Sequence, residues 1–109
     1  MANTFKLKTK ANVGVTTVGI YTAPAATTTV VIGITMANTS GSGVNVGVGI
    51  TRAGTTEDVK LLKNAPIPQG SSLEFMAGNK IVLEATDTVT VDSDTNYSID
   101  AALTIMEIT

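Results

Sequence analysis

Two segments of alternating hydrophobicity, separated by a short polar turn, constrain the fold of this chain more than any other feature. Every second residue from 30 to 36 is large and apolar, and the same is true from 44 to 50. A period of two is that of a β-strand with one buried face. The residues between them, NTSGSG at 38–43, are turn formers. We therefore predict an antiparallel hairpin over the two segments.

The rest of the chain continues in the same way, with short apolar or alternating segments between turn signals. Threonine and valine, which favour strands, are abundant, whereas leucine is scarce. Further strands are expected at residues 5–10, 13–22, 59–62, 72–76, 80–84, 88–92 and 99–108. The sequence thus predicts an all-β, single-domain antiparallel β-sandwich, Ig-like or jelly-roll-like, with eight or nine short strands over residues 11–109. Residues 1–10 are expected to be an N-terminal arm or an edge strand.

The apolar positions of the strongest strands predict the core. These positions are Val30, Ile32, Ile34, Val46, Val48, Ile50, Leu83, Val89, Val91, Leu103 and Ile105. Pro66 and Pro68 cannot donate a hydrogen bond to a neighbouring strand. The segment at 64–70 is therefore expected to cross between the sheets or to run along an edge.

The glycine-rich stretch TSGSGVNVGVGITR at 39–52 could suggest a phosphate-binding loop. A dinucleotide-binding fingerprint needs its third glycine where Val46 stands, and a helix after it, whereas an alternating strand follows here. The stretch is predicted to be a turn and a strand, without a cofactor site. Gly47 and Gly49 fall on one face of that strand, which is either covered by another element or open to solvent. Both are candidate interface residues.

The residue types of most catalytic and metal sites are missing. Without His and Cys, the chain can form no Ser–His or Cys–His pair and no imidazole or thiolate metal site. The sequence DSDTN at 92–96 is similar to the start of a calcium loop. However, Tyr97 stands where that loop needs glycine, and Leu103 stands where it needs a bidentate glutamate. We expect no catalytic, cofactor or metal site and no enzyme activity.

Net charge and hydropathy limit the classes of partner that the chain is expected to bind. A formal charge of −2 gives no field that would gather nucleic acid or an anionic membrane. No run of about 18 apolar residues is present, and MANTFKLKTK lacks the apolar region of a signal peptide. We expect a soluble protein made in a cytoplasm, with neither nucleic acid nor membrane as a partner.

The N-terminal segment combines positively charged and apolar side chains. Lys6, Lys8 and Lys10 alternate with Phe5 and Leu7, so an extended segment shows positive charge on one face and apolar groups on the other. Two interpretations stay open. The segment is either a solvated edge strand that its lysines protect against wrong pairing, or an arm that docks on an acidic neighbour such as another copy of the chain.

Four blocks spanning nearly the whole chain support a resemblance. They are MANTFKLKTKANVG, IYTAPAATTTVVIGITMANTSGSGVNVGV, LLKNAPIPQGSSLEFMAGNKIVLEATDTVTV and ALTIMEIT. In these blocks the chain resembles a family of small virion structural proteins of tailed bacteriophages. The blocks are structural, so the resemblance assigns no active residue and no binding site.

The resemblance implies a virion protein, assembled in the host cytoplasm. The compact size and the lack of a repeat favour a capsid decoration, or cement, protein over a fibre. A tail, neck or baseplate component is the alternative. A host-surface or carbohydrate-binding module is the second alternative, although two Tyr, two Phe and no Trp offer few rings for sugar stacking. The expected partners are the chain itself as a homo-oligomer, with a trimer favoured, and the major capsid protein or the tail proteins of the same virion.

Overall fold

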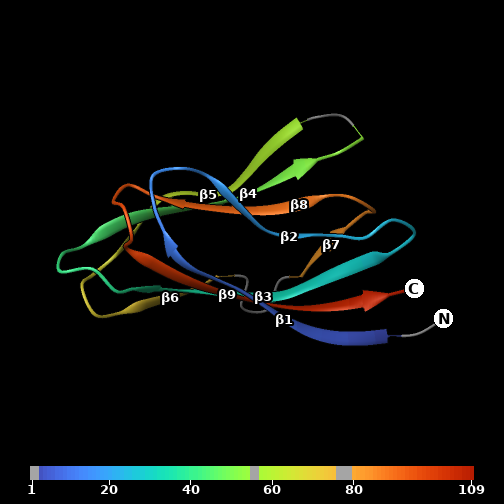
Figure 1. Cartoon of the computed structure of the whole chain (residues 1–109), viewed down its shortest axis with the longest axis horizontal. Coiled ribbons are helices and arrows are strands. Elements are labelled where there is room, and N and C mark those ends of the chain that lie inside the picture. Colours follow the sequence, from blue (N-terminus) through green and yellow to red (C-terminus); the bar gives the residue numbers. More distant parts are fainter. Residues whose placement is uncertain (1–2, 55–56, 76–79) are drawn as a thin grey trace.

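Two antiparallel sheets, packed face to face, form the domain (Figure 1). The computed structural model describes residues 3–54, 57–75 and 80–109. Sheet A has the order β1-β9-β3-β6, with β7 also paired to β3. Its strands are β1 (Asn3–Val13), β3 (Thr28–Asn38), β6 (Ser72–Phe75), β7 (Ile81–Leu83) and β9 (Ile99–Ile108). Sheet B has the order β2-β8-β4-β5 and consists of β2 (Val18–Thr22), β4 (Val44–Arg52), β5 (Glu57–Ile67) and β8 (Thr88–Ser93).

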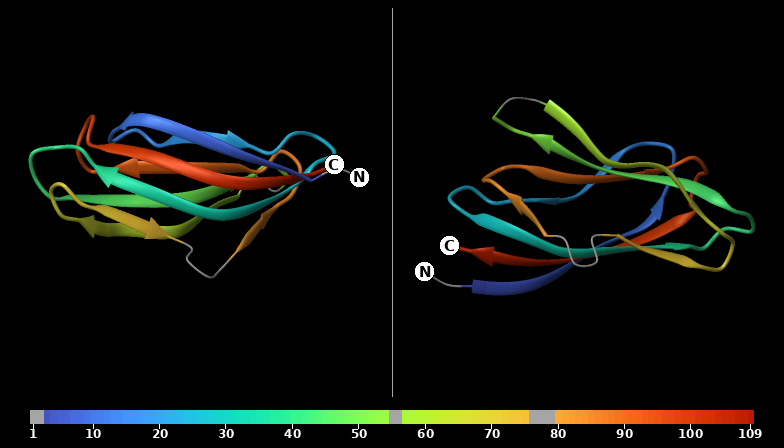
Figure 2. Two further views of the ribbon diagram at one scale, coloured as in Figure 1. Left: turned by 90° about the horizontal axis from the view of Figure 1, so that it is seen from below. Right: turned by 180° about the vertical axis from the view of Figure 1, so that it is seen from behind.

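The predicted all-β antiparallel sandwich is confirmed, and the strand order favours one of its two expected types. The first four strands lie alternately in sheet A and sheet B, and β4 and β5 are the only consecutive strands that pair among the described residues. Alternation between two sheets is typical of a jelly roll, which is built from interlocked Greek keys. Figure 2 shows the two layers from other sides, with both termini at the same end.

The hairpin predicted over 30–36 and 44–50 is wrong. Both segments are strands, but β3 pairs with β6, β7 and β9, whereas β4 pairs with β5 and β8. The turn at 39–43 therefore carries the chain from one sheet to the other. Asn38 holds the turn at its base, since its side-chain amide donates to the carbonyl oxygens of Ser42 at 2.8 Å and Ile67 at 3.0 Å. Local alternation predicts a strand but does not identify its partner.

The core lies between the sheets and contains most of the residues predicted for it. The predicted residues that are buried are Ile34, Val46, Val48, Ile50, Leu83, Val89, Val91, Leu103 and Ile105. Val30 and Ile32 were expected there too and are only half-buried. The reason is a β-bulge between Val31 and Gly33, which reverses the side to which alternate residues point. Val31 is therefore inside the core before the bulge and Ile34 after it.

The proline segment behaves as its chemistry requires. Pro66 lies in β5, which is the edge strand of sheet B, opposite Asn45 of β4. After Ile67 the chain turns and enters β6 in sheet A, so the predicted crossing is confirmed.

Among the described residues, no helix is long and apolar enough to cross a membrane.

Candidate interaction surface

Four apolar side chains form a line across the outer face of sheet A, which we call the apolar row. Phe5 of β1 is opposite Met106 of β9, Met106 is opposite Val30 of β3, and Val30 is opposite Val82 of β7. Directly opposed residues of an antiparallel pair point to the same face. Phe5 is 70% exposed and Val82 is 58% exposed, while Val30 and Met106 are half-buried. The row is thus a continuous apolar strip in contact with water.

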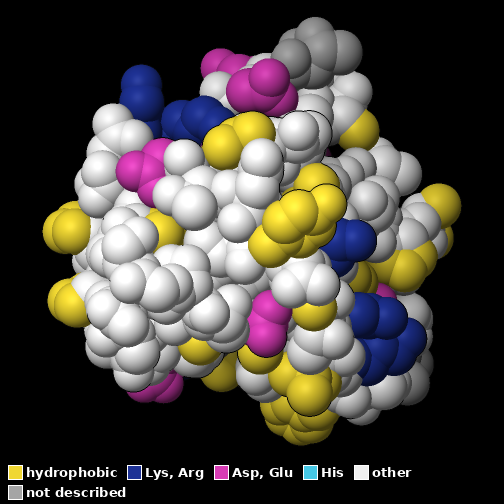
Figure 3. All heavy atoms as spheres, turned by 60° about the vertical axis from the view of Figure 1, so that its left-hand side comes forward, with side chains coloured by type: hydrophobic (Ala, Val, Ile, Leu, Met, Phe, Trp, Pro, Cys, Tyr) yellow, Lys and Arg dark blue, Asp and Glu magenta, His cyan; other side chains and the backbone are white. Residues whose placement is uncertain are grey.

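Around the apolar row, the outward residues of the middle of the sheet are uncharged, whereas Glu74 of β6 stands on the same face opposite Thr35. On β9 the residues that point outward after Asp100 are Ala102, Thr104, Met106 and Ile108, because the alternate residues are buried. The residues opposite them on β1 and β3 are likewise uncharged: Asn3, Phe5, Leu7, Thr9, Thr28, Val30, Gly33 and Thr35. Figure 3 shows a group of apolar side chains at the lower edge of the molecule, which is the side of sheet A in Figure 1, with basic and acidic side chains nearby. A solvated sheet face is ordinarily polar, so this face is suited to contact.

A shallow hollow lies farther along the same face. It has a volume of about 390 Å³ and is lined by Lys10 and by small side chains of β1, β3 and β9, among them Thr9, Ala11 and Ala102. Asp100 also lines it, and its carboxylate accepts a hydrogen bond from the backbone N–H of Asn12 at 3.0 Å. The face therefore has a raised part, with Phe5 and Leu7, and a depressed part.

The lysines of β1 point to the other side of the sheet. Lys6, Lys8 and Lys10 are opposite Ile105, Leu103 and Ala101, all of which are buried. At this open edge they stand on the core side of the strand, where Lys6 and Lys10 are exposed and Lys8 is half-buried. Inward-pointing charge on an edge strand discourages pairing with another strand. Phe5 and Leu7, which are 70% and 65% exposed, are left free on the outer face.

Lys6 is held by a polar cluster inside the sandwich. Its ammonium lies 2.9 Å from Oε1 of Glu107, and the O–H of Tyr21 donates to Oε2 of Glu107 at 2.6 Å. Tyr21 and Thr29 share a further hydrogen bond at 2.7 Å. Donation from Tyr21 and Lys6 lowers the pKa of Glu107. Burial, followed by the hydrogen bond to Glu107, raises the pKa of Tyr21 to about 12. The cluster joins β1 to β9, β3 and β2.

Gly47 and Gly49 lie in sheet B, away from the residues of β1. Both are buried. A Cβ at Gly49 would come within 2.9 Å of the Val59 carbonyl oxygen, and one at Gly47 would lie 3.2 Å from the Leu62 carbonyl oxygen. These glycines allow the irregular strand β5 to approach β4 closely, since the register shifts on both sides of Val48. Their cover comes from the chain itself.

The outer face of sheet B also carries a line of four residues, which we call the polar row. It runs through Thr22, Thr88, Thr51 and Asp58 of four neighbouring strands. The Thr22 and Thr88 hydroxyls lie 2.9 Å apart, and the Thr51 hydroxyl donates to Oδ1 of Asp58 at 2.9 Å. Beside this row, Lys60 and Asp92 form an ion pair at 3.8 Å. This face is satisfied by its own hydrogen bonds and by water.

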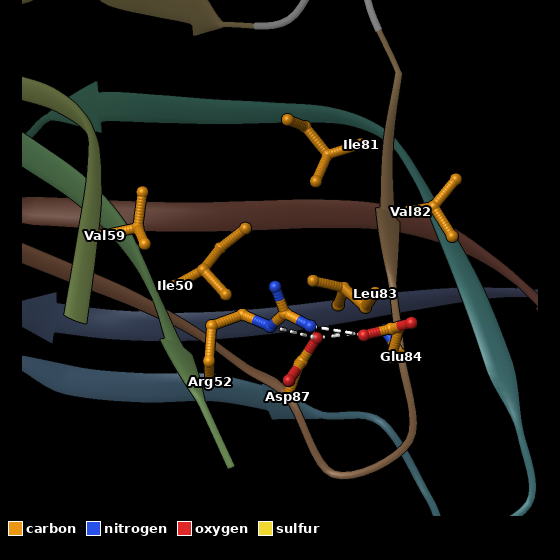
Figure 4. Close-up of a pocket in the computed structure, with 8 residues that line it drawn as sticks. All are labelled: Ile50, Arg52, Val59, Ile81, Val82, Leu83, Glu84 and Asp87. Carbon is orange, nitrogen blue, oxygen red and sulfur yellow. Dashed lines mark hydrogen bonds and ion pairs between the residues drawn. The ribbon is translucent and has the colours of Figure 1, made fainter. Parts of the chain in front are cut away.

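A pocket of about 410 Å³ opens between the sheets, where the β4–β5 hairpin diverges from β7 (Figure 4). Arg52 enters it from β4, and its Nε lies 3.0 Å from Oδ2 of the buried Asp87. A second carboxylate, that of Glu84, contacts the same guanidinium. Asp87 also accepts the backbone N–H of Glu84 at 3.0 Å, which closes the β7–β8 turn. These contacts join the two sheets and leave no unpaired charge on Arg52.

The acidic loop after β8 has structural contacts. Asp94 accepts the backbone N–H of Asn45 at 3.1 Å, and Asp92 accepts the Thr17 hydroxyl at 2.9 Å. Within residues 3–54, 57–75 and 80–109, no three His, Cys, Asp or Glu side chains are grouped to hold a metal ion.

Sequence reasoning found Phe5 and Leu7 but missed the rest of the apolar row. Val30 was assigned to the core, and Met106 and Val82 were not singled out. The available signal was that residues 99–108 are apolar on both faces of the strand, because Ala102, Met106 and Ile108 alternate with Ile99, Leu103 and Ile105. A strand of that kind has two surfaces to cover.

No protein-family model matches the sequence, and no curated protein matches it. Solved structures are similar to it in shape. A protein of the disulfide-linked pili that form Bacillus endospore appendages superposes with a TM-score of 0.57 and 16% identity, over 99% of this chain and 87% of that one. A chain of the infectious bursal disease virus particle gives a TM-score of 0.60 and 12% identity, over 96% of this chain and 30% of that one. A chain of a subviral particle of the same virus gives 0.58 and 9%, over 96% and 32%. At these identities the likeness shows the fold alone.

Proposed function

We propose that this chain is a non-enzymatic structural subunit of a virion, and that it serves as a capsid decoration, or cement, protein of a tailed bacteriophage. The observation that carries the proposal is the apolar row, which crosses the outer face of sheet A from β1 to β7 on an otherwise well-paired jelly roll. A subunit whose task is assembly needs such a surface, and apolar faces of this kind mark contacts with other proteins.

Three further points support the proposal. The sequence resembles small virion proteins of tailed phages over nearly its whole length. The same fold occurs in a virus particle and in a pilus, which are both repetitive assemblies. The pocket at Arg52 is lined by apolar side chains and by charges that are paired with one another. Because the chain has no cysteine, its contacts with neighbours must be noncovalent or use other chemistry than disulfides.

The proposed assembly uses the N-terminal segment. Phe5, Leu7 and the lysines of β1 contact neighbouring subunits or the major capsid protein, in a homo-oligomer for which we favour a trimer. Neither nucleic acid nor membrane is a partner in this proposal, in line with the net charge of −2. Binding of the chain to assembled shells would stabilise them by mass action, as any ligand of an assembled state does.

The proposal is tested by counting copies of the chain in purified virions with quantitative mass spectrometry. A decoration protein covers a closed shell, so on the order of hundreds of copies are expected. Particles that lack the chain should release their contents at lower temperature, and adding purified chain should reverse the effect. Absence from virions would contradict the proposal.

A tail, neck or baseplate component is the second candidate, and the pilus protein favours it because that neighbour forms a filament. The same count separates the two candidates. A handful of copies, found on detached tails and not on empty heads, would replace the decoration role with the tail role.

A further inference from the structure

The outer face of sheet A has a form that fits a second copy of itself. Its raised part, with Phe5 and Leu7 exposed by 70% and 65%, lies toward the N-terminal end of β1. The hollow of about 390 Å³ lies farther along the same strand, around Thr9 and Ala11. Raised and hollow parts therefore follow one another along the strand direction of one face. A face with both parts can be complementary to itself.

We propose that two copies of this chain pack through the outer faces of their sheets A, related by a two-fold axis that runs across the strands. That axis places β1 of one copy over β1 of the other in the opposite direction. Phe5 and Leu7 of each copy then lie over the hollow of its partner, and the apolar row is buried twice.

The size of the face suits a stable contact. The molecule measures 45 × 26 × 21 Å, and Figure 1, viewed down the shortest axis, shows the two sheets edge-on and stacked along the intermediate dimension, so each sheet face spans the longest and the shortest dimensions. A standard protein interface buries roughly 800 Å² per partner, which a face of this extent can supply. The outward residues of β9 from Ala102 onward, and their partners on β1 and β3, bring no charge that would have to be desolvated, and the charges near the contact are those of Lys10 and Asp100, which line the hollow.

The edge of sheet A is a less suitable contact. β1 exposes its backbone at this edge, but Lys6, Lys8 and Lys10 stand on its core side, where an added strand would meet their charge. Lys6 is in addition engaged by Glu107 at 2.9 Å. Contact through the face needs no rearrangement of these lysines. The outer face of sheet B is already satisfied by the polar row and by the Lys60–Asp92 pair.

This inference rests on the proposed function in one respect, namely that a structural subunit must carry contacts between subunits. The inference identifies the outer face of sheet A as one contact surface between subunits, and a second copy of the chain as its partner. Phe5 and Leu7 cannot serve this two-fold contact and a head-to-tail trimer contact at once, because a trimer needs two different surfaces. In this inference the trimer is therefore formed through other surfaces, and the two-fold contact is the one that the purified chain makes in solution.

The test compares two exposed valines. Val82 is 58% exposed in the apolar row, and Val15 is 56% exposed in the β1–β2 turn, away from the face. Sedimentation velocity over a range of concentrations should show a reversible monomer–dimer equilibrium for the wild type. Val82→Glu should weaken it on the order of 100-fold, since the two-fold axis buries two carboxylates per dimer. Val15→Glu should leave it unchanged.

Circular dichroism shows whether each variant keeps the β fold, and Phe5→Ser replaces Val82→Glu if the latter does not. A wild type that stays monomeric at every concentration overturns the inference, as does an equal effect of Val82→Glu and Val15→Glu. Failure of the proposed function is distinguishable, because it concerns the virion. If the chain is abundant in virions but monomeric in solution, the proposed function stands and this contact is wrong. If the chain forms the dimer but is absent from virions, the contact stands and the proposed function is wrong.

Discussion

The two sheets differ in the chemistry of their solvent-facing sides, because the outer face of sheet B is polar and that of sheet A is largely apolar. Across sheet B the polar row links Thr22, Thr88, Thr51 and Asp58 with hydrogen bonds of 2.9 Å within two of its strand pairs. Across sheet A the apolar row leaves a phenylalanine and a valine in water. One face is complete in the isolated chain, and the other is not.

The contrast separates folding from assembly within one small domain. Cross-strand pairs of threonine and charged residues stabilise a sheet and keep its face hydrated. Cross-strand apolar pairs stabilise the sheet too, but their outer surface gains free energy only when another surface removes it from water. The hydrogen bonds on the outer face of sheet B therefore form on folding, whereas in our proposal a partner covers the outer face of sheet A.

The largest effect on stability should come from β3, in which the bulge reverses the side to which alternate residues point. Ile34 of β3 is 1% exposed, whereas Ile32 lies at the bulge and is half-buried. Ile34→Ala should lower the free energy of unfolding by about 2–5 kcal/mol, because it leaves a cavity in the core. Ile32→Ala should lower it by less than half as much. Urea unfolding of the two variants measures this, and equal losses would mean that the boundary between core and outer face is misplaced.

The polar cluster under β1 should give the next largest effect. Tyr21→Phe removes the donor to the buried Glu107 and should lower the free energy of unfolding by about 1.5–3 kcal/mol near neutral pH. If instead Tyr21→Phe is neutral, the inner side of β1 is held by packing alone.

The same cluster predicts how stability depends on pH. Because the pKa of Glu107 is lowered in the folded state, its contribution is complete above the ordinary value of about 4.3 and is lost as the pH falls below it. The pKa of Tyr21 is raised from 10.0 to about 12, so its contribution is complete below pH 10 and is lost as the pH rises toward 12. Urea unfolding at several pH values should show the wild type and Glu107→Gln converging in acid. Parallel curves would contradict the assignment.

Two glycines, one in each sheet, sharpen the comparison of the faces. A Cβ at Gly49 in sheet B would lie 2.9 Å from the Val59 carbonyl oxygen and 3.1 Å from Oγ1 of Thr90, whereas a Cβ at Gly33 in sheet A has nothing within 4 Å. Gly49→Ala should cost about 1–3 kcal/mol through overpacking. Gly33→Ala should be neutral or stabilise by up to about 1 kcal/mol, because it restricts the unfolded chain. Thermal melting under dilute conditions compares them, and a large loss at Gly33 would show a constraint that the open face does not explain.

The smallest effect should come from the ion pair beside the polar row. Lys60 and Asp92 lie 3.8 Å apart at the surface, and pairs of this kind contribute about 0–1 kcal/mol. Lys60→Gln should therefore change stability by less than about 1 kcal/mol, and added salt should remove the difference. A larger or salt-independent loss, measured by thermal melting, would show that the face of sheet B depends on this pair.

The sequence predicted strands well because each strand is a local pattern. The segments at 30–36 and 44–50 are both strands, and the proline segment crosses between sheets as the missing N–H groups of Pro66 and Pro68 require. The pairing of β3 with β9 depends on residues about 70 positions apart, which alternation does not encode. The hairpin prediction failed for that reason.

The sequence predicted only part of the candidate surface, for a related reason. Phe5 and Leu7 stand out because lysines flank them, but Val30 was assigned to the core by extending the alternation of Ile34 and Met36 backward through the bulge. A single extra residue in β3 moves Val30 to the outer face and opposite Met106. Bulges of this kind follow from the packing of the whole sheet, and Gly33 inside the strand pattern was the one local signal of this bulge.

Met106 offers the most direct test of the central claim, that assembly covers the outer face of sheet A. It lies in the middle of the apolar row and is half-buried, whereas Met36 is fully buried in the core and serves as an internal reference. Peroxide converts accessible methionine to the sulfoxide, which peptide mass spectrometry measures. We predict that Met106 oxidises much more slowly in the assembled protein than in the dilute chain, while Met36 stays slow in both. Equal rates for Met106 in the two states would contradict the account.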